Sequence, residues 1–352
     1  MLTRKADSAQ KNFSLISRGK LLLLAVVMAG LWYVTAPSVL TSEEQLLWEK
    51  VRAAQLHLSQ WREQNGTVAA LENDPWSCGL VGVEWSGITT TLGELGSKRT
   101  ACNPTWAIQF SRWFSELGLQ PGDHIAIYAS GSFPGMLLNA IVAAEAKELK
   151  PLLIVSLGAS TWGANHPDAP WPVLATELRH GGFIRKRADY YTLGGGEELG
   201  RGLAPEGESL LREAVEDAGV DLLTAGNLES IISRKVELLE EHKSRLLISI
   251  GGSQANLGDA LEVLRLNPGL LSADEAELAG NGVIGAAMRD NIPVIHMLNI
   301  RSLSNRVGIP YDSLPRKVAP ARVSKWWSVI GVILFLTVLV RHRRWRLEPA
   351  EE

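Results

Sequence analysis

Three strand-like runs of this chain each end in a loop rich in Gly, Ser and Asn. They are His124–Ser130 followed by Gly131–Gly135, Leu152–Ser156 followed by Leu157–Asn165, and Leu246–Ile250 followed by Gly251–Gly258. Open α/β sheets bind their ligands in the crevice at the carboxyl ends of the strands. The loops therefore predict one polar pocket, rich in backbone N–H donors, at that edge of a sheet.

Strand and helix patterns alternate along most of the chain. A strand over 124–130, a helix from about 136 to 149 and a strand over 151–157 form a βαβ unit, which implies parallel strands. Further strands are expected at 80–86, 220–224, 245–250 and 292–298, and further helices at 103–118, 206–218, 227–243 and 277–289. We predict an α/β fold with a mostly parallel sheet and helices on both faces, a Rossmann-like three-layer arrangement. Residues 159–205 show little periodicity and are interpreted as an insertion or a wall of the site.

Two apolar segments near the ends of the chain predict two flanking transmembrane helices, at 21–36 and 326–340. Trp and Tyr residues at their borders are typical of membrane interfaces, and no clear signal-peptide cleavage site follows the first segment. Basic residues precede the first segment and follow the second, which places both termini in the cytoplasm. The sequence thus predicts a two-pass protein of the bacterial plasma membrane with its main domain in the periplasm or outside the cell.

The predicted organisation has six parts. They are a cytoplasmic basic tail (1–20), a transmembrane helix (21–36), a juxtamembrane amphipathic helix with a linker (37–70), an extracytoplasmic α/β domain (71–325), a second transmembrane helix (326–340) and a second cytoplasmic basic tail (341–352). Thr41–Glu44 has the pattern of a capping box and marks the start of the amphipathic helix.

The charge distribution excludes some classes of partner. The first 20 residues carry a net charge of +4 and the last 12 carry +1, so the remainder of a chain with net charge −3 carries −8. A domain with this negative charge does not attract polyanions through its overall electrostatic field. Nucleic acid is therefore not expected as a partner, and any polyanion would have to be recognised by a local basic pocket.

No cofactor or metal is expected. A phosphate-binding P-loop and a G-x-G-x-x-G motif are both absent, and the spacing of Cys and His fits no metal site. The two cysteines, Cys78 and Cys102, flank the predicted strand 80–86, whose length holds their Cα atoms too far apart for a disulfide unless residues 87–101 double back.

Two residues are candidates for catalysis. Ser132 lies between a strand and a helix, where a nucleophile elbow would sit, and His296 near the end of the last strand could be its base. The G-x-S-x-G pattern is missing and no acid is placed behind His296, which favours the alternative interpretation of the loop as a backbone nest for an anion with serine as a hydrogen-bond donor.

Candidate ligand-binding residues are the polar groups and glycines near the ends of the predicted strands. Lysine and arginine could meet carboxylates, whereas hydroxyls, amides and glycine N–H groups supply neutral hydrogen bonds. The set is Glu84, Ser86, Thr89, Thr90, Lys98, Arg99, Ser130, Gly131, Asn139, Ser160, Asn165, Gly251, Gly252 and Arg301.

Several stretches together resemble the poly-gamma-glutamate system protein family. They are Glu84–Thr90 with Lys98, Gly131–Pro134 with Asn139, Ser156–Ser160 with Gly163–Asn165, Ile250–Gly252, and Pro293–His296. The family accompanies the bacterial poly-gamma-glutamate synthase and its membrane partner. The resemblance implies a pathway and a partner complex, and it implies no particular reaction.

We therefore expect an accessory membrane protein of poly-gamma-glutamate synthesis or export, whose outer domain binds the polymer or a synthase partner. One alternative is an extracytoplasmic serine hydrolase or transferase that trims or releases the polymer through Ser132 and His296. The other is a structural scaffold of the synthase complex, in which the loops bind nothing.

Overall fold

The structure is a computed structural model that describes residues 22–31, 40–319 and 326–344. The chain divides into two compact units, residues 40–319 and the terminal segments 1–39 with 320–352. In the terminal unit, the described residues form a helix over 22–31 and helix α12 (Trp326–Arg344).

The predicted transmembrane helices at 21–36 and 326–340 are wrong as far as the structure describes them. No helix within 22–31, 40–319 or 326–344 combines the length and the apolar character that a bilayer requires. The first helix covers ten described residues, and α12 ends in the polar run Arg341–Arg344, whereas a span needs about 20 predominantly apolar residues. This finding also overturns the two-pass location with a periplasmic or extracellular main domain. Residues 21 and 32–36 and the predicted tails 1–20 and 345–352 lie outside the described residues.

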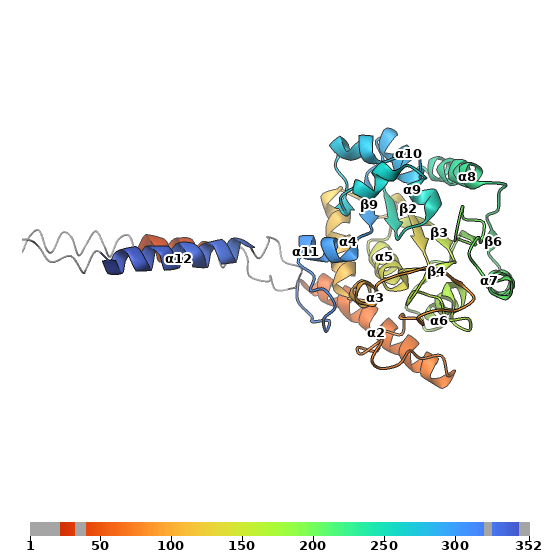
Figure 1. Cartoon of the computed structure of the whole chain (residues 1–352), viewed down its shortest axis with the longest axis horizontal. Coiled ribbons are helices and arrows are strands. Elements are labelled where there is room, and N and C mark those ends of the chain that lie inside the picture. The colour runs from red at the N-terminus through yellow and green to blue at the C-terminus, as the bar shows by residue number, and fades with distance from the viewer. Residues whose placement is uncertain (1–21, 32–39, 320–325, 345–352) are drawn as a thin grey trace, which may run out of the picture. The chain divides into compact units, whose positions relative to one another are not determined.

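A seven-stranded sheet forms the centre of the unit 40–319 (Figure 1). Its strand order is β6 (Asp221–Leu222), β5 (Tyr190–Thr192), β3 (Lys150–Ser156), β2 (His124–Ser130), β7 (Leu247–Ile250), β9 (Val294–Met297) and β8 (Gly269–Leu270). All neighbouring pairs are parallel except β8 with β9. The predicted α/β fold with a mostly parallel sheet is therefore confirmed. Strands β1 (Thr89–Thr91) and β4 (Ala159–Ser160) form a separate parallel pair.

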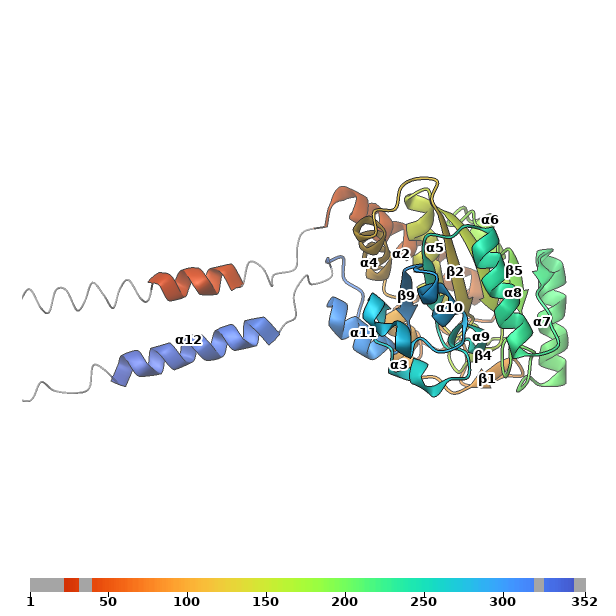
Figure 2. The ribbon, with the colours of Figure 1, turned by 90° about the horizontal axis from the view of Figure 1, so that it is seen from above.

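Helices cover both faces of the sheet (Figure 2). On one face lie α2 (Ser42–Gln64), α4 (Thr105–Glu116), α5 (Pro134–Ala146) and α6 (Trp171–His180), and α7 (Pro205–Ala218) packs on α6. On the other face lie α8 (Leu228–Glu241), α9 (Gln254–Leu257), α10 (Val283–Arg289) and the 3₁₀ turns η1 (Leu261–Arg265) and η2 (Ala273–Leu278). Two further helices, α3 (Leu95–Ala101) and α11 (Ile300–Val307), contact one another.

The side-chain alternation of the central strand explains the two layers. Ile125 and Ile127 of β2 join the apolar core that includes α4 and α5, whereas Ala126 and Tyr128 join the core that includes α8 and α10. Successive residues of a strand point to opposite faces, so a strand that is apolar throughout must be covered on both sides. The uninterrupted apolar character of β2 therefore requires a three-layer packing.

The segment 80–86 does not form the strand that we predicted from its sequence. Side chains bind its backbone instead: Arg62 donates hydrogen bonds to the carbonyls of Gly79 and Val81, and Asn165 bonds both the N–H and the carbonyl of Val83. Because these backbone groups already have partners, the segment needs no neighbouring strand.

The two cysteines lie side by side. The Sγ atoms of Cys78 and Cys102 are 2.9 Å apart, both residues are buried, and both are free thiols. The predicted separation required an extended strand at 80–86, and no strand forms there.

Candidate functional site

A cavity of about 520 Å³ opens at the carboxyl ends of the central strands. Its walls come from six segments that lie far apart in the sequence. The lining residues are Thr90, Thr91, Leu92, Gly93, Glu94, Ser97, Lys98, Ser130, Ser132, Phe133, Ser156, Gly158, Ser160, Gly194, Gly195, Gly196, Glu198, Gly252, Ser253, Gln254, Leu257, Gly258, Leu298, Asn299 and Ile300.

The strand order explains why the cavity lies here. From β2 the chain passes to β3, β5 and β6 on one side of the sheet, and then to β7 and β9 on the other. Adjacent strands whose connections leave in opposite directions open a crevice at their carboxyl ends, as β2 and β7 do here. Ser130 ends β2, and the loop that contains Gly252 follows β7.

Lys98 lies in the wall of this cavity without an acidic partner. Its side chain is 3% exposed, and Nζ donates hydrogen bonds to the carbonyl of Ser132 (2.7 Å) and to Oγ of Ser160 (2.6 Å). Nζ also lies 3.7 Å from the ring centroid of Phe133. No carboxylate of the described chain forms an ion pair with this amine. Burial therefore lowers the pKa of Lys98 to about 7.

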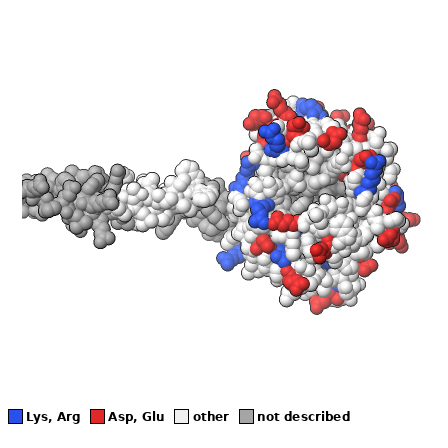
Figure 3. All heavy atoms as spheres, viewed as in Figure 1, with Lys and Arg blue, Asp and Glu red and all other residues white. Residues whose placement is uncertain are grey.

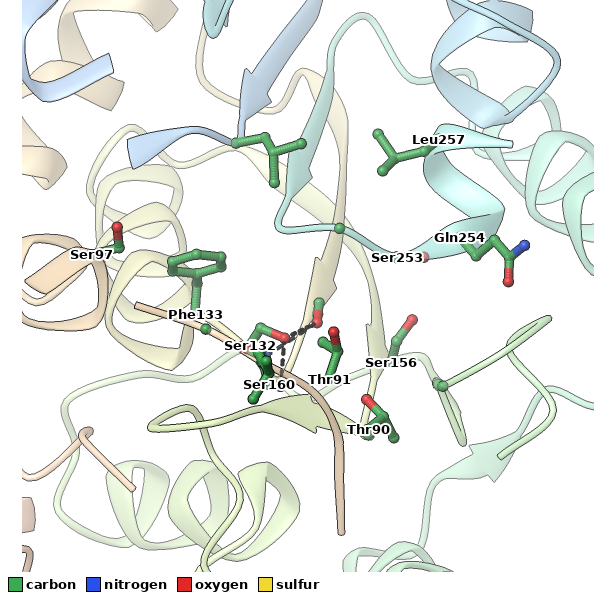
Figure 4. A pocket seen from close by; sticks show the side chains of 18 of the residues that line it. Thr90, Thr91, Ser97, Ser132, Phe133, Ser156, Ser160, Ser253, Gln254 and Leu257 are labelled. Atoms are coloured by element: carbon green, nitrogen blue, oxygen red, sulfur yellow. Dashed lines mark hydrogen bonds between the residues drawn. The ribbon is translucent and has the colours of Figure 1, made fainter. Parts of the chain in front are cut away.

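Three serines, Ser130, Ser132 and Ser160, meet beside Lys98. Figure 4 shows Ser132 next to Ser160. Oγ of Ser132 accepts hydrogen bonds from Oγ of Ser130 and from the backbone N–H of Ser160, each 2.9 Å long. Ser130 ends β2 and Ser160 ends β4, so the bonds connect two of the loops. Gly93 makes room for this contact, because a Cβ atom at that position would lie 2.8 Å from Oγ of Ser160.

A second buried polar network lies in another wall. Glu198 accepts hydrogen bonds from the hydroxyls of Ser156 (2.6 Å), Thr192 (2.5 Å) and Ser253, and it forms an ion pair with Lys235. Burial by itself raises the pKa of Glu198, but the charge of Lys235 and the three hydroxyls outweigh it and lower that pKa overall. The Glu198 carboxylate is therefore ionised and already neutralised before any ligand arrives.

The mouth of the cavity carries a third group of polar side chains. Glu94 accepts hydrogen bonds from Ser97 (3.1 Å) and Arg301, and Tyr311 lies under the guanidinium of Arg301 at 4.1 Å from its ring centroid. Arg301 and Glu94 are both more than half exposed, so the pair remains accessible to a ligand.

The face that carries the hollow is mostly uncharged at its centre, and its acidic and basic side chains lie around the edge (Figure 3). A cavity of this kind recognises a ligand through hydrogen bonds in its interior and through charge at its mouth.

The structure brings six of the sixteen predicted site residues to the cavity. They are Thr90, Lys98, Ser130, Ser132, Ser160 and Gly252. The three predicted loops, 131–135, 157–165 and 251–258, each contribute residues to the lining of the cavity. This agrees with the rule that open α/β sheets bind ligands at the carboxyl ends of their strands.

Other predicted ligand-binding residues hold the loops in place behind the cavity. Asn165 donates to Oγ1 of Thr89 and its carbonyl accepts from Ser86, whereas Asn139 bonds the backbone of Ala107 at the start of α4. Four more lie outside the lining. Gly131 and Gly251 are backbone positions beside it, Glu84 is exposed, and Arg301 lies at the mouth.

Arg99 points away from the cavity. Its guanidinium donates to the carbonyls of Asn73 and Glu72 and pairs with Asp312 at 3.3 Å. These contacts attach α3 to two surface segments, so Arg99 positions the helix that carries Lys98.

His296 does not line the cavity, and no hydrogen bond joins it to Ser132 within residues 40–319. Its Nδ1 is buried without a partner, and burial lowers its pKa to about 4. The Ser132–His296 pair thus stays a prediction that no contact supports.

Sequence reasoning missed several members of the site. Phe133, Glu198 and Ser253 were not named, although Ser253 follows directly on Gly251–Gly252 and Glu198 follows the run Gly194–Gly196. A glycine run is a usable signal for a loop that packs against a ligand. Nothing in the local sequence of Glu198 indicates its partner Lys235.

Comparisons with known proteins found no family model that matches the chain, no similar curated protein and no similar solved structure. The geometry and chemistry of the cavity are therefore the basis for a proposed function. Among the described residues, no group of three His, Cys, Asp or Glu side chains is arranged to hold a metal ion.

Proposed function

We propose that this chain serves a poly-gamma-glutamate system and that its cavity binds a short segment of γ-glutamyl chain. The observation that carries the proposal is the convergence of hydroxyls and glycines from five of the six lining segments on one cavity with an arginine at its mouth. A γ-linked glutamyl unit presents an amide and a carboxylate, which need this combination of neutral donors inside and a cation outside.

The distribution of donors suggests how such a segment would lie. Amide groups would reach the hydroxyls of Thr90, Thr91 and Ser97, while a carboxylate would meet Arg301. Glu94 engages Nη2 of Arg301, and a guanidinium has further N–H donors that it can offer to a second carboxylate. Lys98 has its Nζ engaged by two protein oxygens and is therefore not assigned to the carboxylate.

The size of the cavity limits the length of the segment. Its volume of about 520 Å³ lies in the range of small-molecule sites, so it holds a chain end or a short oligomer. The acidic balance of the chain agrees with this, because a long polyanion would be repelled by the surface outside the cavity. An accessory role beside the synthase, such as holding the growing end, follows from a site of this size.

The test is a binding measurement by calorimetry with γ-glutamyl oligomers of increasing length, with α-linked glutamate oligomers and ATP as controls. We expect saturable binding of the γ-linked oligomers, with an affinity that stops rising once the cavity is filled. Binding of ATP in their place, or no binding of any oligomer, would refute the proposal, and the second result would favour a scaffold.

Gly252 offers a sharp variant, because a Cβ atom there meets no atom within 4 Å and the cavity lies beside it. Gly252→Phe adds an aromatic ring to the lining of the cavity and should weaken oligomer binding by about tenfold or more, or at least ~1.4 kcal/mol. Gly226→Phe is the matched control, since Gly226 is equally unobstructed, is exposed and lies outside the lining. Equal affinities of the two variants would contradict the assignment of the cavity.

A further inference from the structure

The contact between Ser160 and Lys98 is that of a hydroxyl nucleophile with its base. Oγ of Ser160 and Nζ of Lys98 are 2.6 Å apart, well within hydrogen-bond reach. The ammonium form of Lys98 donates across this contact, whereas the neutral amine accepts the Ser160 proton. A neutral amine in this position is therefore placed to remove that proton when the oxygen attacks.

The surroundings of Lys98 favour the neutral amine. Nζ is buried against the Phe133 ring and the carbonyl of Ser132, and no carboxylate of the described chain pairs with it. Desolvation without a counter-charge disfavours the ammonium. Lys235 shows the contrast: it is equally buried in the same unit, but the Glu198 carboxylate pairs with it. A lysine that only held the fold together would be expected to have such a partner.

The other serines complete the arrangement. Oγ of Ser132 accepts hydrogen bonds from the Ser130 hydroxyl and from the N–H of Ser160. Its own hydroxyl proton can therefore point into the cavity. That proton is available to an oxyanion that forms beside Ser160. Ser160 is buried but lines the cavity, and Gly93 leaves room beside its hydroxyl, because a Cβ atom at 93 would lie 2.8 Å from Oγ.

We propose that Ser160 is the nucleophile and Lys98 the general base of an acyl-transfer centre that cleaves an amide in this cavity. Ser160 Oγ attacks the carbonyl carbon and Lys98 takes its proton. The C–N bond then breaks, and Lys98 returns the proton to the departing amine, which leaves an ester on Ser160. Water attacks the ester carbon while Lys98 takes its proton. The bond between that carbon and Ser160 Oγ then breaks and Lys98 returns the proton to Oγ, which gives a carboxylic acid and the free enzyme.

The substrate class rests on the proposed function, which makes the amide a γ-glutamyl linkage with the departing amine on the next unit of the chain. An amine of a second chain could replace water, and the same centre would then join chains. The centre itself depends only on Ser160, Lys98 and Ser132.

The experiment uses the full-length protein and two chromogenic probes. γ-Glutamyl-p-nitroanilide tests the proposed amide, and p-nitrophenyl acetate tests the nucleophile without any glutamyl group. Samples quenched in acid are digested, and mass spectrometry locates the acyl group. We expect the adduct on the peptide that contains Ser160, and its absence from that peptide in the wild-type protein would overturn the centre.

Three variants and one control test the roles. Ser160→Ala and Lys98→Met should each lower the rate by at least ~10³-fold, as loss of a nucleophile or its base does, and Ser132→Ala by about 10²-fold as an oxyanion donor. Ser209→Ala, on the exposed surface of α7, should leave the rate unchanged. Full activity in Ser160→Ala or Lys98→Met would refute the assignment.

The pH profile and one further variant separate catalysis from a structural role. The rate should rise with pH through about 7 as Lys98 loses its proton. The other titratable groups near Lys98 or in the same cavity are Cys102, Glu94 and Glu198. In Ser160→Cys, iodoacetamide should alkylate position 160 faster than the buried Cys78 and Cys102, and Lys98→Met should remove this advantage. A pH-independent rate, or no preference for position 160, would contradict the inference.

The outcomes for the two proposals can be distinguished. If γ-glutamyl oligomers bind but no probe acylates Ser160, the binding function stands and the acyl-transfer centre is refuted. If p-nitrophenyl acetate acylates Ser160 while no γ-glutamyl oligomer binds, the centre stands and the substrate class is refuted.

Discussion

Glu198 and Lys235 form an ion pair with 3.6 Å between Oε2 and Nζ, and each side chain is 1% exposed. The pair joins the glycine-rich loop after β5 to α8. Removing one partner of a buried pair leaves a charge without compensation, which costs about 3–5 kcal/mol.

We predict that Glu198→Gln lowers the free energy of unfolding by roughly that amount, because the Lys235 ammonium stays buried and unpaired. Chemical denaturation followed by circular dichroism measures the loss. The double variant Glu198→Gln with Lys235→Met should recover part of the lost stability. A single variant within experimental error of the wild type would show that the pair contributes nothing.

The stability of the protein should depend on pH through Lys98. Burial lowers the pKa of Lys98 to about 7, far below that of the unfolded chain, so the unfolded state binds more protons between these values. The free energy of unfolding should therefore increase as the pH rises above 7. From pH 7 to 8.5 the gain attributable to Lys98 is roughly 1–2 kcal/mol.

Denaturation of the wild type and of Lys98→Met at several pH values measures this gain as the difference between the two proteins. We expect the variant to lack the Lys98 increment and to be more stable than the wild type near pH 7. Parallel pH curves for the two proteins would show that the amine titrates at an ordinary pKa.

Gly82 packs against the loop that ends in Asn165. A Cβ atom at Gly82 would lie 2.1 Å from the carbonyl of Gly163 and from Oδ1 of Asn165. Because a backbone carbonyl cannot move aside cheaply, Gly82→Ala should destabilise the fold by about 1–3 kcal/mol. Thermal unfolding measures this, and Gly226→Ala, where the new atom meets nothing, should change stability by about 0.5 kcal/mol at most. Similar effects of both variants would contradict the close contact.

The cysteine pair should oxidise within one molecule. The thiols of Cys78 and Cys102 are buried and adjacent, and burial raises the pKa of Cys78 well above its usual range. Diamide should therefore form an intramolecular disulfide slowly at neutral pH and faster at alkaline pH, where more thiolate is present. Mass spectrometry of the unreduced protein measures the loss of two protons. Dimers on a non-reducing gel, or a disulfide in Cys78→Ser, would contradict this expectation.

The central strands were predictable because their sequences are apolar throughout. The predicted strand 124–130 matches β2, and 245–250 contains β7, since a strand buried on both faces leaves a run of apolar residues in any context. Strand β5 (Tyr190–Thr192) was missed. It has three residues, and it exists because β3 offers a pairing edge, which no local pattern records.

The candidate site was predictable in part for the same reason. The loops at 131, 157 and 251 follow long strands, so the sheet brings them to one edge whatever their side chains are. The partners that set the chemistry were not predictable. Ser160 meets Lys98 across 62 residues and Glu198 meets Lys235 across 37, and both distances depend on the packed fold.

In the terminal segments, a clear sequence pattern led to a wrong prediction. Their apolar composition was interpreted as two membrane spans, but the described helices are too short or too polar at one end. An apolar run in the sequence therefore does not by itself establish a membrane span.

The cavity is complete only when most of the chain is present, which matters during synthesis and after proteolysis. Its walls begin at Thr90 and are complete only with Ile300, so most of the chain must be synthesised before any ligand can bind. A nascent chain released early, or a proteolytic fragment that ends before β9, contains the serines and the lysine but lacks a wall. The complete cavity therefore forms only late in synthesis, after the residues up to Ile300 have been made.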